Sequence, residues 1–596
     1  MALPLTNIKT SMSNSPALGA RRVRLWYAAL LLIVTIFGVR LFYVQIIRYS
    51  HYKYAALSDQ LKQYEIPANR GTIKAYNNDQ VVPIVLNQKL YTLYADPTYV
   101  KNPDLVARQV STIIGSDETR LNKLLRSKHT RYVILAKKLS ADQNTRLLSL
   151  KYPGLGSQAQ DYRTYPQSDL ASQLLGFVDD SGNGQYGIEQ ALNKTLKGTP
   201  GQLRAITDIG GVPLAASRDN TEVPAVSGSD VVLTIDLALQ QQVQMALQKY
   251  VASTGASGAS AVVLNPYSGA VKAMANFPSF DPSKYDQVTD SKLFANASVS
   301  HPIEVGSIMK VLTTAAALDK GAISANSTYY DPSFWLVNGF RITNIEEDGG
   351  SGTRSIADIL NLSLNTGATW ELMQLGGGSI NDRARNVWHD YMVKHFLFGQ
   401  PTGIEQGYEA SGFVPDPAEN GAGINLTYAN TTFGQAMTAT PVQMAAALSA
   451  TLNGGTYYQP HLVDQTIGSS GVVISHPSKI LIHNVVSPTV SQALIPLMQN
   501  VVQKHNFFPQ FDQNRYIVGG KTGTAQIAKP GGGYYDDKFN GTYLGFVGGD
   551  KVQYVIAVFV DKPTNGGYAG TAAAQPVFGS IAHTLIDESM VTPKTR

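Results

Sequence analysis

The stretch Ser307–Leu318, SIMKVLTTAAAL, consists of residues that favour a helix, and Gly321 after it is a typical helix stop. Ser307 and Lys310 occupy positions i and i+3, which share one face of a helix. The Lys310 amine can therefore reach the Ser307 hydroxyl and take its proton. A serine hydroxyl is a weak nucleophile until a base does this. The stretch predicts a helix that begins at an activated serine.

The start of this predicted helix suits a developing negative charge. A helix N-terminus offers free N–H groups and the positive end of the helix dipole. We expect the backbone N–H groups of Ser307 and Thr524 to form an oxyanion hole. Lys310 can act as a base only if its pKa falls, and we expect burial and the charge of Lys521 to lower it.

Two further strings complete the pattern, Ser363-Leu364-Asn365 and Lys521-Thr522-Gly523-Thr524. The S-x-x-K and S-x-N patterns are weak alone, because Ser50–Lys53 and Ser181–Asn183 also fit them. The third string is rarer. Its glycine interrupts a strand-like run, which costs strand stability unless something approaches that backbone closely. A substrate laid along the strand edge would do so.

Together, the three strings resemble the motif set of the penicillin-binding proteins. The segment before them resembles the N-terminal module of the class B, monofunctional members, and we see no stretch that would house the glycosyltransferase of class A members. The segments similar to the transpeptidase domain are Gly228–Asp236, Asn265–Met274, Phe277–Pro282, Phe433–Ala436, Thr440–Gln443 and Tyr543–Val547; those similar to the N-terminal module are Arg70–Ile73, Arg163–Pro166 and Gly187–Glu189.

Two departures from the family pattern stand out. Glu304-Val305-Gly306 precedes the serine where the family usually has Pro-Gly, and because proline restricts φ, Val305 puts the rigidity of that turn in question. The usual Asp-Arg-Asn-Gly of the N-terminal module is replaced by Ala75–Asn78. This second departure lies in the N-terminal module and does not involve the predicted catalytic residues.

From Ala256 onward the sequence predicts hairpins enclosing helices, and the final strands include the apolar run Tyr554–Val560. This pattern predicts an α+β fold: an antiparallel sheet flanked by helices and a mostly helical insert that carries Ser363. An elongated N-terminal pedestal and one transmembrane helix are expected before this domain. The expected parts are a cytoplasmic tail at 1–23, the transmembrane helix at 24–47, a pedestal or dimerisation-like module at 48–226, the transpeptidase domain at 227–590 and a tail at 591–596.

The resemblance also implies a peptidoglycan D,D-transpeptidase that cross-links stem peptides ending in D-Ala-D-Ala, with β-lactams as covalent inhibitors. Ser307 is then the nucleophile, Lys310 the base and Ser363 a proton relay. Substrate binding falls to Asn365, Lys521, Thr522, Gly523 and Thr524. Implied partners are the membrane, a SEDS-type glycan polymerase and other division or elongation proteins.

Other functions fit parts of the pattern. A β-lactam sensor or hydrolase would use the same site, but it needs only the catalytic domain and not the long N-terminal module. An inactive scaffold for division or elongation proteins fits the substitution at Val305, although all three strings are retained. Septation is favoured over side-wall growth because Glu304 resembles division-type members.

The composition sets limits on the class of protein. The chain has 596 residues and 43% of them are apolar, which predicts two or more globular cores. It has no cysteine, which excludes disulfides and thiolate metal sites and fits a bacterial envelope protein. The net charge of +5 is small for this length and gives no reason to expect nucleic acid. We expect no cofactor and no metal.

An apolar stretch near the N-terminus predicts the membrane helix. Leu25–Val39 is mostly apolar, and Leu41–Ile47 extends it past Arg40. At about 1.5 Å per residue the whole run spans roughly 34 Å, enough for a hydrocarbon layer of about 30 Å. Arginines precede it, so the positive-inside rule keeps residues 1–23 in the cytoplasm and the catalytic domain outside. The alternative is a cleaved signal peptide, but no A-x-A-like site follows.

Three other groups of residues were candidates for function. His301 lies close to Ser307 and invites a Ser-His-Asp assignment, but it precedes Pro302 in a predicted loop. Glu346-Glu347-Asp348 offers carboxylates for a metal or an acid, although the glycines after it favour a solvated loop. The Tyr534-Tyr535 pair is either a lip that gates the substrate or an ordinary hairpin loop.

Overall fold

The computed structural model describes residues 16–52, 61–206, 221–344, 350–418, 421, 423–505, 511–529, 531–565 and 567–595. Most of the predicted tail at 1–23 and the acidic run Glu346–Asp348 lie outside these ranges. The chain forms two compact units, one made of Met1–Ala68 with Thr199–Val226 and the other of Asn69–Gly198 with Ser227–Arg596.

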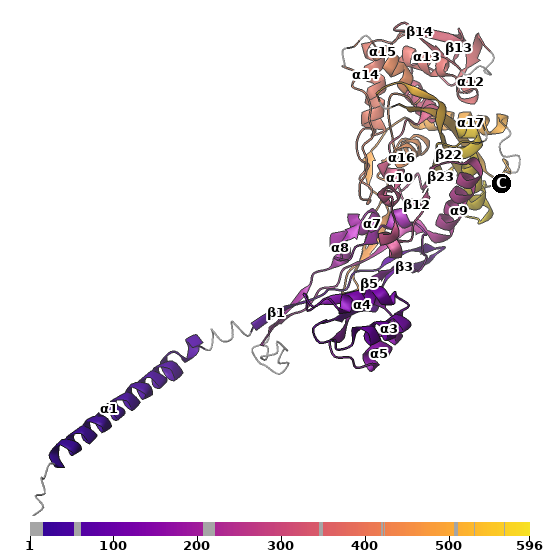
Figure 1. Cartoon of the computed structure of the whole chain (residues 1–596). Coiled ribbons are helices and arrows are strands. Elements are labelled where there is room, and N and C mark those ends of the chain that lie inside the picture. Colours follow the sequence, from indigo (N-terminus) through magenta and orange to yellow (C-terminus); the bar gives the residue numbers. More distant parts are fainter. Residues whose placement is uncertain are drawn as a thin grey trace, which may run out of the picture. The chain divides into compact units, whose positions relative to one another are not determined.

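The smaller unit contains the apolar N-terminal segment as one helix. Helix α1 spans Pro16–Phe42, and a π-helical turn, η1, continues it over Tyr43–Ile47 (Figure 1). The part Arg22–Ile47 is long and apolar enough to cross a membrane, and none of its most apolar stretch is buried in the protein. The helix predicted over 24–47 is therefore confirmed as an element. The same unit holds a three-stranded antiparallel sheet in the order β1 (Leu61–Ile66), β8 (Gly201–Ile206), β9 (Thr221–Val223).

The larger unit contains a seven-stranded mixed sheet. It joins the predicted pedestal to the predicted catalytic domain, because β10 of the latter pairs in parallel with β2 of the former, Val231 opposite Ile73. Helices α3, α4 and α5 enclose a small core against β3 and β4. The strands follow the order β19 (Val473–Ser475), β18 (Val463–Ile467), β10 (Asp230–Asp236), β2 (Ile73–Asn77), β3 (Gln80–Ala95), β4 (Val133–Leu139), with β5 (Leu155–Thr164) on β3; the helices are α3 (Pro103–Ile114), α4 (Glu118–Leu125) and α5 (Ala141–Ser149).

A second sheet of five antiparallel strands supports the predicted catalytic site. Its strand β23 shows how two cores form. Val555, Ala557 and Phe559 join one core while Ile556, Val558 and Val560 join the other, because side chains alternate along a strand. The order is β12 (Val271–Phe277), β11 (Gly258–Leu264), β23 (Val552–Asp561), β22 (Tyr534–Gly548), β21 (Ile517–Ala528), which leaves β21 at an edge.

Helices cover both faces of this sheet, as predicted. Helices α9 (Leu237–Thr254) and α18 (Gln575–Asp587) pack on one face, and α11 (Met309–Asp319), α16 (Pro441–Leu452) and α17 (Pro488–Lys504) share the core of the other. The α+β assignment is therefore confirmed.

The residues between α11 and α16 form the predicted, mostly helical insert. Its α13 packs against α11, and the buried Trp388 of α14 also belongs to the core that α11 joins. Within the larger unit, Figure 1 shows the insert helices at one end and α3–α5 at the other. The insert contains β13 (Thr328–Asp331), β14 (Phe334–Val337), β15 (Phe340–Thr343), β16 (Gly352–Ser355), α12 (Ile356–Asn361), α13 (Asn365–Leu375), α14 (Asp382–Asp390), η6 (Tyr391–His395) and α15 (Ile424–Thr431).

Short elements complete the larger unit. They are α6 (Ser172–Leu175), β6 (Phe177–Val178), β7 (Gly184–Gln185), α7 (Gly187–Ala191), α8 (Asn193–Lys197), η2 (Pro282–Gln287), η3 (Ser291–Phe294), α10 (Ala297–Ser300), η4 (Gly306–Ile308), β17 (Tyr457–Tyr458), β20 (Ile480–Ile482) and η7 (Gly570–Ala574).

Candidate active site

Ser307 lies at the start of the predicted helix. It occupies the 3₁₀ turn η4, which leads directly into α11, and Gly321 follows the helix end with φ +67°. The helix is buried along most of its length because it passes through the core between the sheet and the insert. Lys310 sits in its first turn with 0% of its surface exposed. Both sequence predictions, the helix and its stop, are confirmed.

Lys310 collects the first two strings into one hydrogen-bonded cluster. Its Nζ lies 3.0 Å from Ser307 Oγ, 3.1 Å from Ser363 Oγ and 2.8 Å from Asn365 Oδ1. It also contacts the Ser363 carbonyl oxygen. A neutral amine has a lone pair, so the same 3.0 Å contact allows Ser307 to donate its proton to Lys310. The cluster connects two hydroxyl groups through one amine, which is the arrangement that a proton relay requires.

The backbone at Ser363 is held in an uncommon conformation. Ser363 has φ +57°, a left-handed value that non-glycine residues seldom adopt. It lies in the tight connection between α12 and α13, and this connection points its hydroxyl and carbonyl groups at the same amine. Asn365 begins α13 and is fixed by a 3.0 Å hydrogen bond from its Nδ2 to the Thr343 carbonyl. Strain of this kind concentrates at functional sites.

The third string lies on edge strand β21, next to the turn before Ser307. A side chain at Gly523 would place its Cβ 2.2 Å from Thr542 Oγ1 and 2.8 Å from the Val305 carbonyl oxygen. A Cβ on Gly306, which has φ +65°, would lie 3.1 Å from the Thr524 carbonyl oxygen. The close approach predicted at Gly523 is therefore made by the protein's own turn before Ser307, and not by a substrate as predicted.

The remaining residues of the third string are held along β21. Lys521 is 2% exposed, and its Nζ lies 3.0 Å from the Thr522 carbonyl oxygen. Thr524 Oγ1 accepts a 3.0 Å hydrogen bond from the Gly570 N–H. The Thr524 hydroxyl proton is therefore directed elsewhere. Thr522 and Thr524 are two positions apart and share one face of the strand, whereas the buried Lys521 side chain leaves from the other face.

Contacts replace the usual proline before the nucleophile. Val305 has φ −81°, close to the value of about −65° that proline imposes. Its side chain is buried, and its carbonyl oxygen accepts a 2.8 Å hydrogen bond from Thr542 Oγ1. Gly306 N–H donates to the Gly434 carbonyl oxygen at 3.0 Å. The turn is fixed by its neighbours, so the substitution does not leave Ser307 loosely held.

Glu304 connects three segments around this turn, a role that sequence reasoning missed. Its Oε1 accepts hydrogen bonds from the Ala436 N–H at 2.8 Å and from the Tyr534 hydroxyl at 2.9 Å. Burial raises the pKa of Glu304. Tyr534 begins strand β22, so the base of the hairpin at 528–534 is tied to the residue three positions before Ser307. The contact spans 230 positions and leaves no local signal in the sequence.

Sequence reasoning also missed a second carboxyl group, which contacts helix α11 about one turn beyond Lys310. Glu371 on α13 is fully buried, and its Oε1 accepts a 2.8 Å hydrogen bond from Thr314 Oγ1 on α11. Its Oε2 finds no hydrogen-bond partner among the described residues. Burial raises the pKa of Glu371 to about 8, and the charge of Lys310 opposes this shift. Glu371 is thus mostly protonated at neutral pH.

His301, the alternative base from the sequence, does not reach the cluster. His301 is exposed and places its ring edge-on to Phe559, with centroids 5.8 Å apart. The base that contacts Ser307 is Lys310. Over the part of the chain that the structure describes, no group of three or more His, Cys, Asp or Glu residues is arranged to hold a metal ion.

Known proteins match this chain along most of its length. The model of the penicillin binding protein transpeptidase domain matches residues 259–583, and that of the penicillin-binding protein dimerisation domain matches residues 65–233. The penicillin-binding protein PbpB of Mycolicibacterium smegmatis is 31% identical over 94% of this chain and 89% of its own length. The probable peptidoglycan D,D-transpeptidase PbpC of Pseudomonas aeruginosa is 26% identical over 92% of this chain and 93% of its own length.

A solved structure gives the same result. The crystal structure of penicillin binding protein 3 from Mycobacterium tuberculosis, complexed with aztreonam, superposes with a TM-score of 0.66. It is 26% identical and covers 89% of this chain and 98% of its own.

Proposed function

This chain belongs to the penicillin-binding proteins as a class B peptidoglycan D,D-transpeptidase, and we propose that it cross-links stem peptides through an acyl-enzyme on Ser307. One observation carries the assignment of the nucleophile. The Lys310 amine, buried at the start of α11, lies 3.0 Å from Ser307 Oγ.

In the first step, Ser307 Oγ attacks the carbonyl carbon between the two D-alanines of a donor stem, and its proton passes to Lys310 Nζ. The C–N bond then breaks and D-alanine leaves. The backbone N–H groups of Ser307 and Thr524 stabilise the oxyanion that forms between these events. The position of Ser307 within η4, with the β21 backbone packed against Gly306, supports this assignment.

The leaving amine needs a proton, and the Lys310 cluster supplies a route. Lys310 Nζ lies within 3.1 Å of Ser363 Oγ, so the proton taken from Ser307 moves through Ser363 to the departing nitrogen. Asn365 hydrogen-bonds the backbone amide of the substrate. Lys521, Thr522 and Thr524, with Gly523 keeping the strand edge clear, hold the terminal carboxylate.

In the second step, an amine from a neighbouring stem attacks the ester and restores Ser307. The same groups act in reverse order, with Lys310 and Ser363 taking the proton from the attacking amine. A site that excludes water favours this amine over hydrolysis.

The N-terminal segment suits a single-pass anchor, because Arg22–Ile47 is long and apolar enough to cross a membrane. We propose that residues 1–23 are cytoplasmic and that the catalytic domain at 227–590 is periplasmic or extracellular, raised on the module at 48–226. A SEDS-type glycan polymerase is the proposed partner, and the division septum the proposed place of action.

The proposed reaction is tested with the detergent-solubilised full chain, a donor peptide ending in D-Ala-D-Ala and an amine acceptor. We expect release of D-alanine and formation of the peptide–amine product, both lost in Ser307→Ala. Release of D-alanine with only the hydrolysed peptide as product, at every acceptor concentration, would favour a hydrolase. A wild-type protein that reacts with neither the donor nor a β-lactam would favour the inactive scaffold.

A further inference from the structure

A buried cluster of charged residues in the N-terminal module is not neutral. Glu189 is fully buried and binds two guanidinium groups, Arg163 Nε at 2.6 Å and Arg70 Nη2 at 2.5 Å. The side chains of Arg163 and Arg70 are only 4% and 10% exposed. Two positive charges therefore share one negative charge in a place shielded from water. Buried charge without compensation is costly, so such a cluster favours an additional anion.

One side of the Arg163 guanidinium is unsatisfied. Its Nε donates to Glu189, and its Nη1 donates to the Gly71 carbonyl at 2.7 Å and to Asn87 Oδ1 at 2.8 Å. Its Nη2 is buried and has no hydrogen-bond partner among the residues that the structure describes. Native proteins leave few buried donors unpaired, and an unpaired guanidinium nitrogen is a strong donor for a carboxylate.

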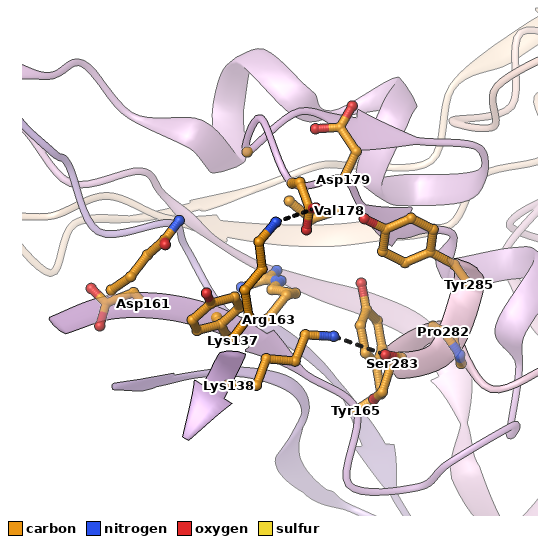
Figure 2. Close-up of a pocket in the computed structure, with 14 residues that line it drawn as sticks. Lys137, Lys138, Asp161, Arg163, Tyr165, Val178, Asp179, Pro282, Ser283 and Tyr285 are labelled. Carbon is orange, nitrogen blue, oxygen red and sulfur yellow. Dashed lines mark hydrogen bonds and ion pairs between the residues drawn. The ribbon is translucent and has the colours of Figure 1, made fainter. Parts of the chain in front are cut away.

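A second unsatisfied donor lines the same cavity. Tyr165 is 6% exposed, and its hydroxyl oxygen has no partner in hydrogen-bond geometry among the described residues. Burial and the charge of Glu189 raise the pKa of Tyr165 well above its usual value, while Arg163, Arg70 and a backbone contact at Val178 lower it. The hydroxyl therefore keeps its proton. Arg163 and Tyr165 both line a cavity of about 90 Å³, larger than one water needs (Figure 2).

Two consecutive lysines of strand β4 line the same cavity, because the strand loses its regular alternation of side chains at Lys138. Neighbouring residues of a strand normally point to opposite faces. Lys138 has φ +60°, and both it and Lys137 line the cavity (Figure 2). Lys138 Nζ donates to the Ser283 carbonyl at 2.9 Å, and Lys137 Nζ pairs with Asp180 at 2.6 Å. The two lysines thus connect strand β4 to Ser283 and Asp180 on the other side of the cavity, and neither bonds to Arg163 or Tyr165 among the described contacts.

The acidic residues of the wall do not occupy the place of the missing anion. Asp179 Oδ1 accepts from the backbone N–H groups of Ser181 and Asn183, at 2.9 and 3.0 Å. Asp180 is exposed and paired with Lys137, and Asp161 is exposed. Asp161 has no ion pair or side-chain hydrogen bond among the described residues, so it is the carboxylate of the wall that favours a ligand with a positive charge.

The cavity continues into a larger one of about 640 Å³. The two share seven lining residues, and the larger cavity adds polar groups such as Gln88, Thr164 and Asp286. A small inorganic anion would leave this space unfilled. We propose that the joined cavities bind a short peptide, with its terminal carboxylate against Arg163 and Tyr165 and an amine toward Asp161. This site is separate from Ser307 and does not depend on the proposed reaction.

Binding is measured by calorimetry on the full chain in detergent, with N-acetyl-Lys-D-Ala-D-Ala as the probe. The Ser307→Ala variant serves as the background, so that no acyl-enzyme forms. We expect saturable binding that is lost with the C-terminal amide of the same peptide. Inorganic phosphate and acetate should bind more weakly than the peptide, because they reach only the inner donors. An all-L peptide that binds equally would support the site and assign it to peptide carboxylates in general.

Tyr165→Phe distinguishes this site from the catalytic one. Loss of a hydrogen bond to a charged group should weaken peptide binding at the cavity about 10-fold or more. Folding stability should hardly change, since the removed hydroxyl has no partner in hydrogen-bond geometry among the described residues. In a protein that keeps Ser307, the rate of β-lactam acylation should be that of wild type. Tyr132→Phe, an exposed tyrosine outside the cavity, is the matched control. The proposal would be overturned if the Tyr165→Phe and Tyr132→Phe proteins bound the peptide with equal affinity. It would also be overturned if the amide bound as well as the peptide, or if phosphate bound and the peptide did not.

Discussion

The Nζ atom of Lys310 lies 3.0 Å from the Oγ atom of Ser307, in a cluster that also contains Ser363 and Asn365. The distance is that of an ordinary hydrogen bond, so a proton can pass without rearrangement of the helix. Lys521 lies on strand β21 and contacts the Thr522 carbonyl. The two buried lysines therefore stand on different elements, and we assign them different roles.

Arginine substitutions separate these roles. Lys310→Arg keeps the charge, but a guanidinium does not deprotonate at working pH and cannot act as a base. Acylation by a chromogenic β-lactam should fall at least ~100-fold in this variant, the scale of lost general-base catalysis. Lys521→Arg retains the electrostatic role and should lose much less, mainly through weaker binding. Comparable losses in both variants, at comparable melting temperatures, would mean that the lysines are not divided into base and anchor.

Glu371 should make the stability of the protein fall as the pH rises. Its pKa is raised from 4.5 to about 8 by burial, so the folded state holds its proton more tightly than the unfolded state does. The resulting stabilisation is complete below about pH 4.5 and is lost as the pH rises through about 8.

Denaturant unfolding at pH 5, 7 and 9 measures this effect against Glu371→Gln. The advantage of wild type over the variant should shrink with increasing pH, by at most about 1.4 kcal/mol per pH unit. Curves for the two proteins that stay parallel across this range would show that Glu371 does not titrate there.

The contact between Glu304 and Tyr534 should stabilise the catalytic domain. Tyr534→Phe removes the hydroxyl that donates to Glu304 Oε1 at 2.9 Å and should cost roughly 1–2 kcal/mol of unfolding free energy. Tyr535→Phe is the matched control on the same strand. Two variants with the same stability as wild type would mean that the hairpin is not fixed through Glu304.

Much of the fold was predictable because its signals are local. The helix after Ser307 follows from a run of helix formers and a glycine stop, and the sheet follows from apolar strands such as β23. The apolar N-terminal helix was equally clear. Ser363 was predictable as a residue type but not in its conformation, because nothing in its neighbours requires φ +57°.

The contacts that sequence reasoning missed join distant segments. Glu304 and Tyr534 are 230 positions apart, and Thr314 and Glu371 are 57 apart on two different helices. The reason for Gly523 was also out of reach, since it depends on how the turn at Val305 packs against β21. Such pairings are determined by tertiary packing, which no single stretch of sequence records.

The topology of the chain is tested with a reporter that is active only outside the cytoplasm. Fused after Arg596, the reporter should be active, because the arginines before the apolar helix keep the N-terminus inside. The mature protein should retain Met1 or Ala2. An N-terminus near residue 50, found by sequencing, would remove the anchor from the account.

The central claim is that Ser307 is the nucleophile. The most direct measurement is to label the full chain with a penicillin, digest it and locate the adduct by mass spectrometry. We predict one adduct on the peptide that contains Ser307, and none in Ser307→Ala at an unchanged melting temperature. An adduct on Ser363, or stoichiometric labelling that persists in Ser307→Ala, would contradict the claim.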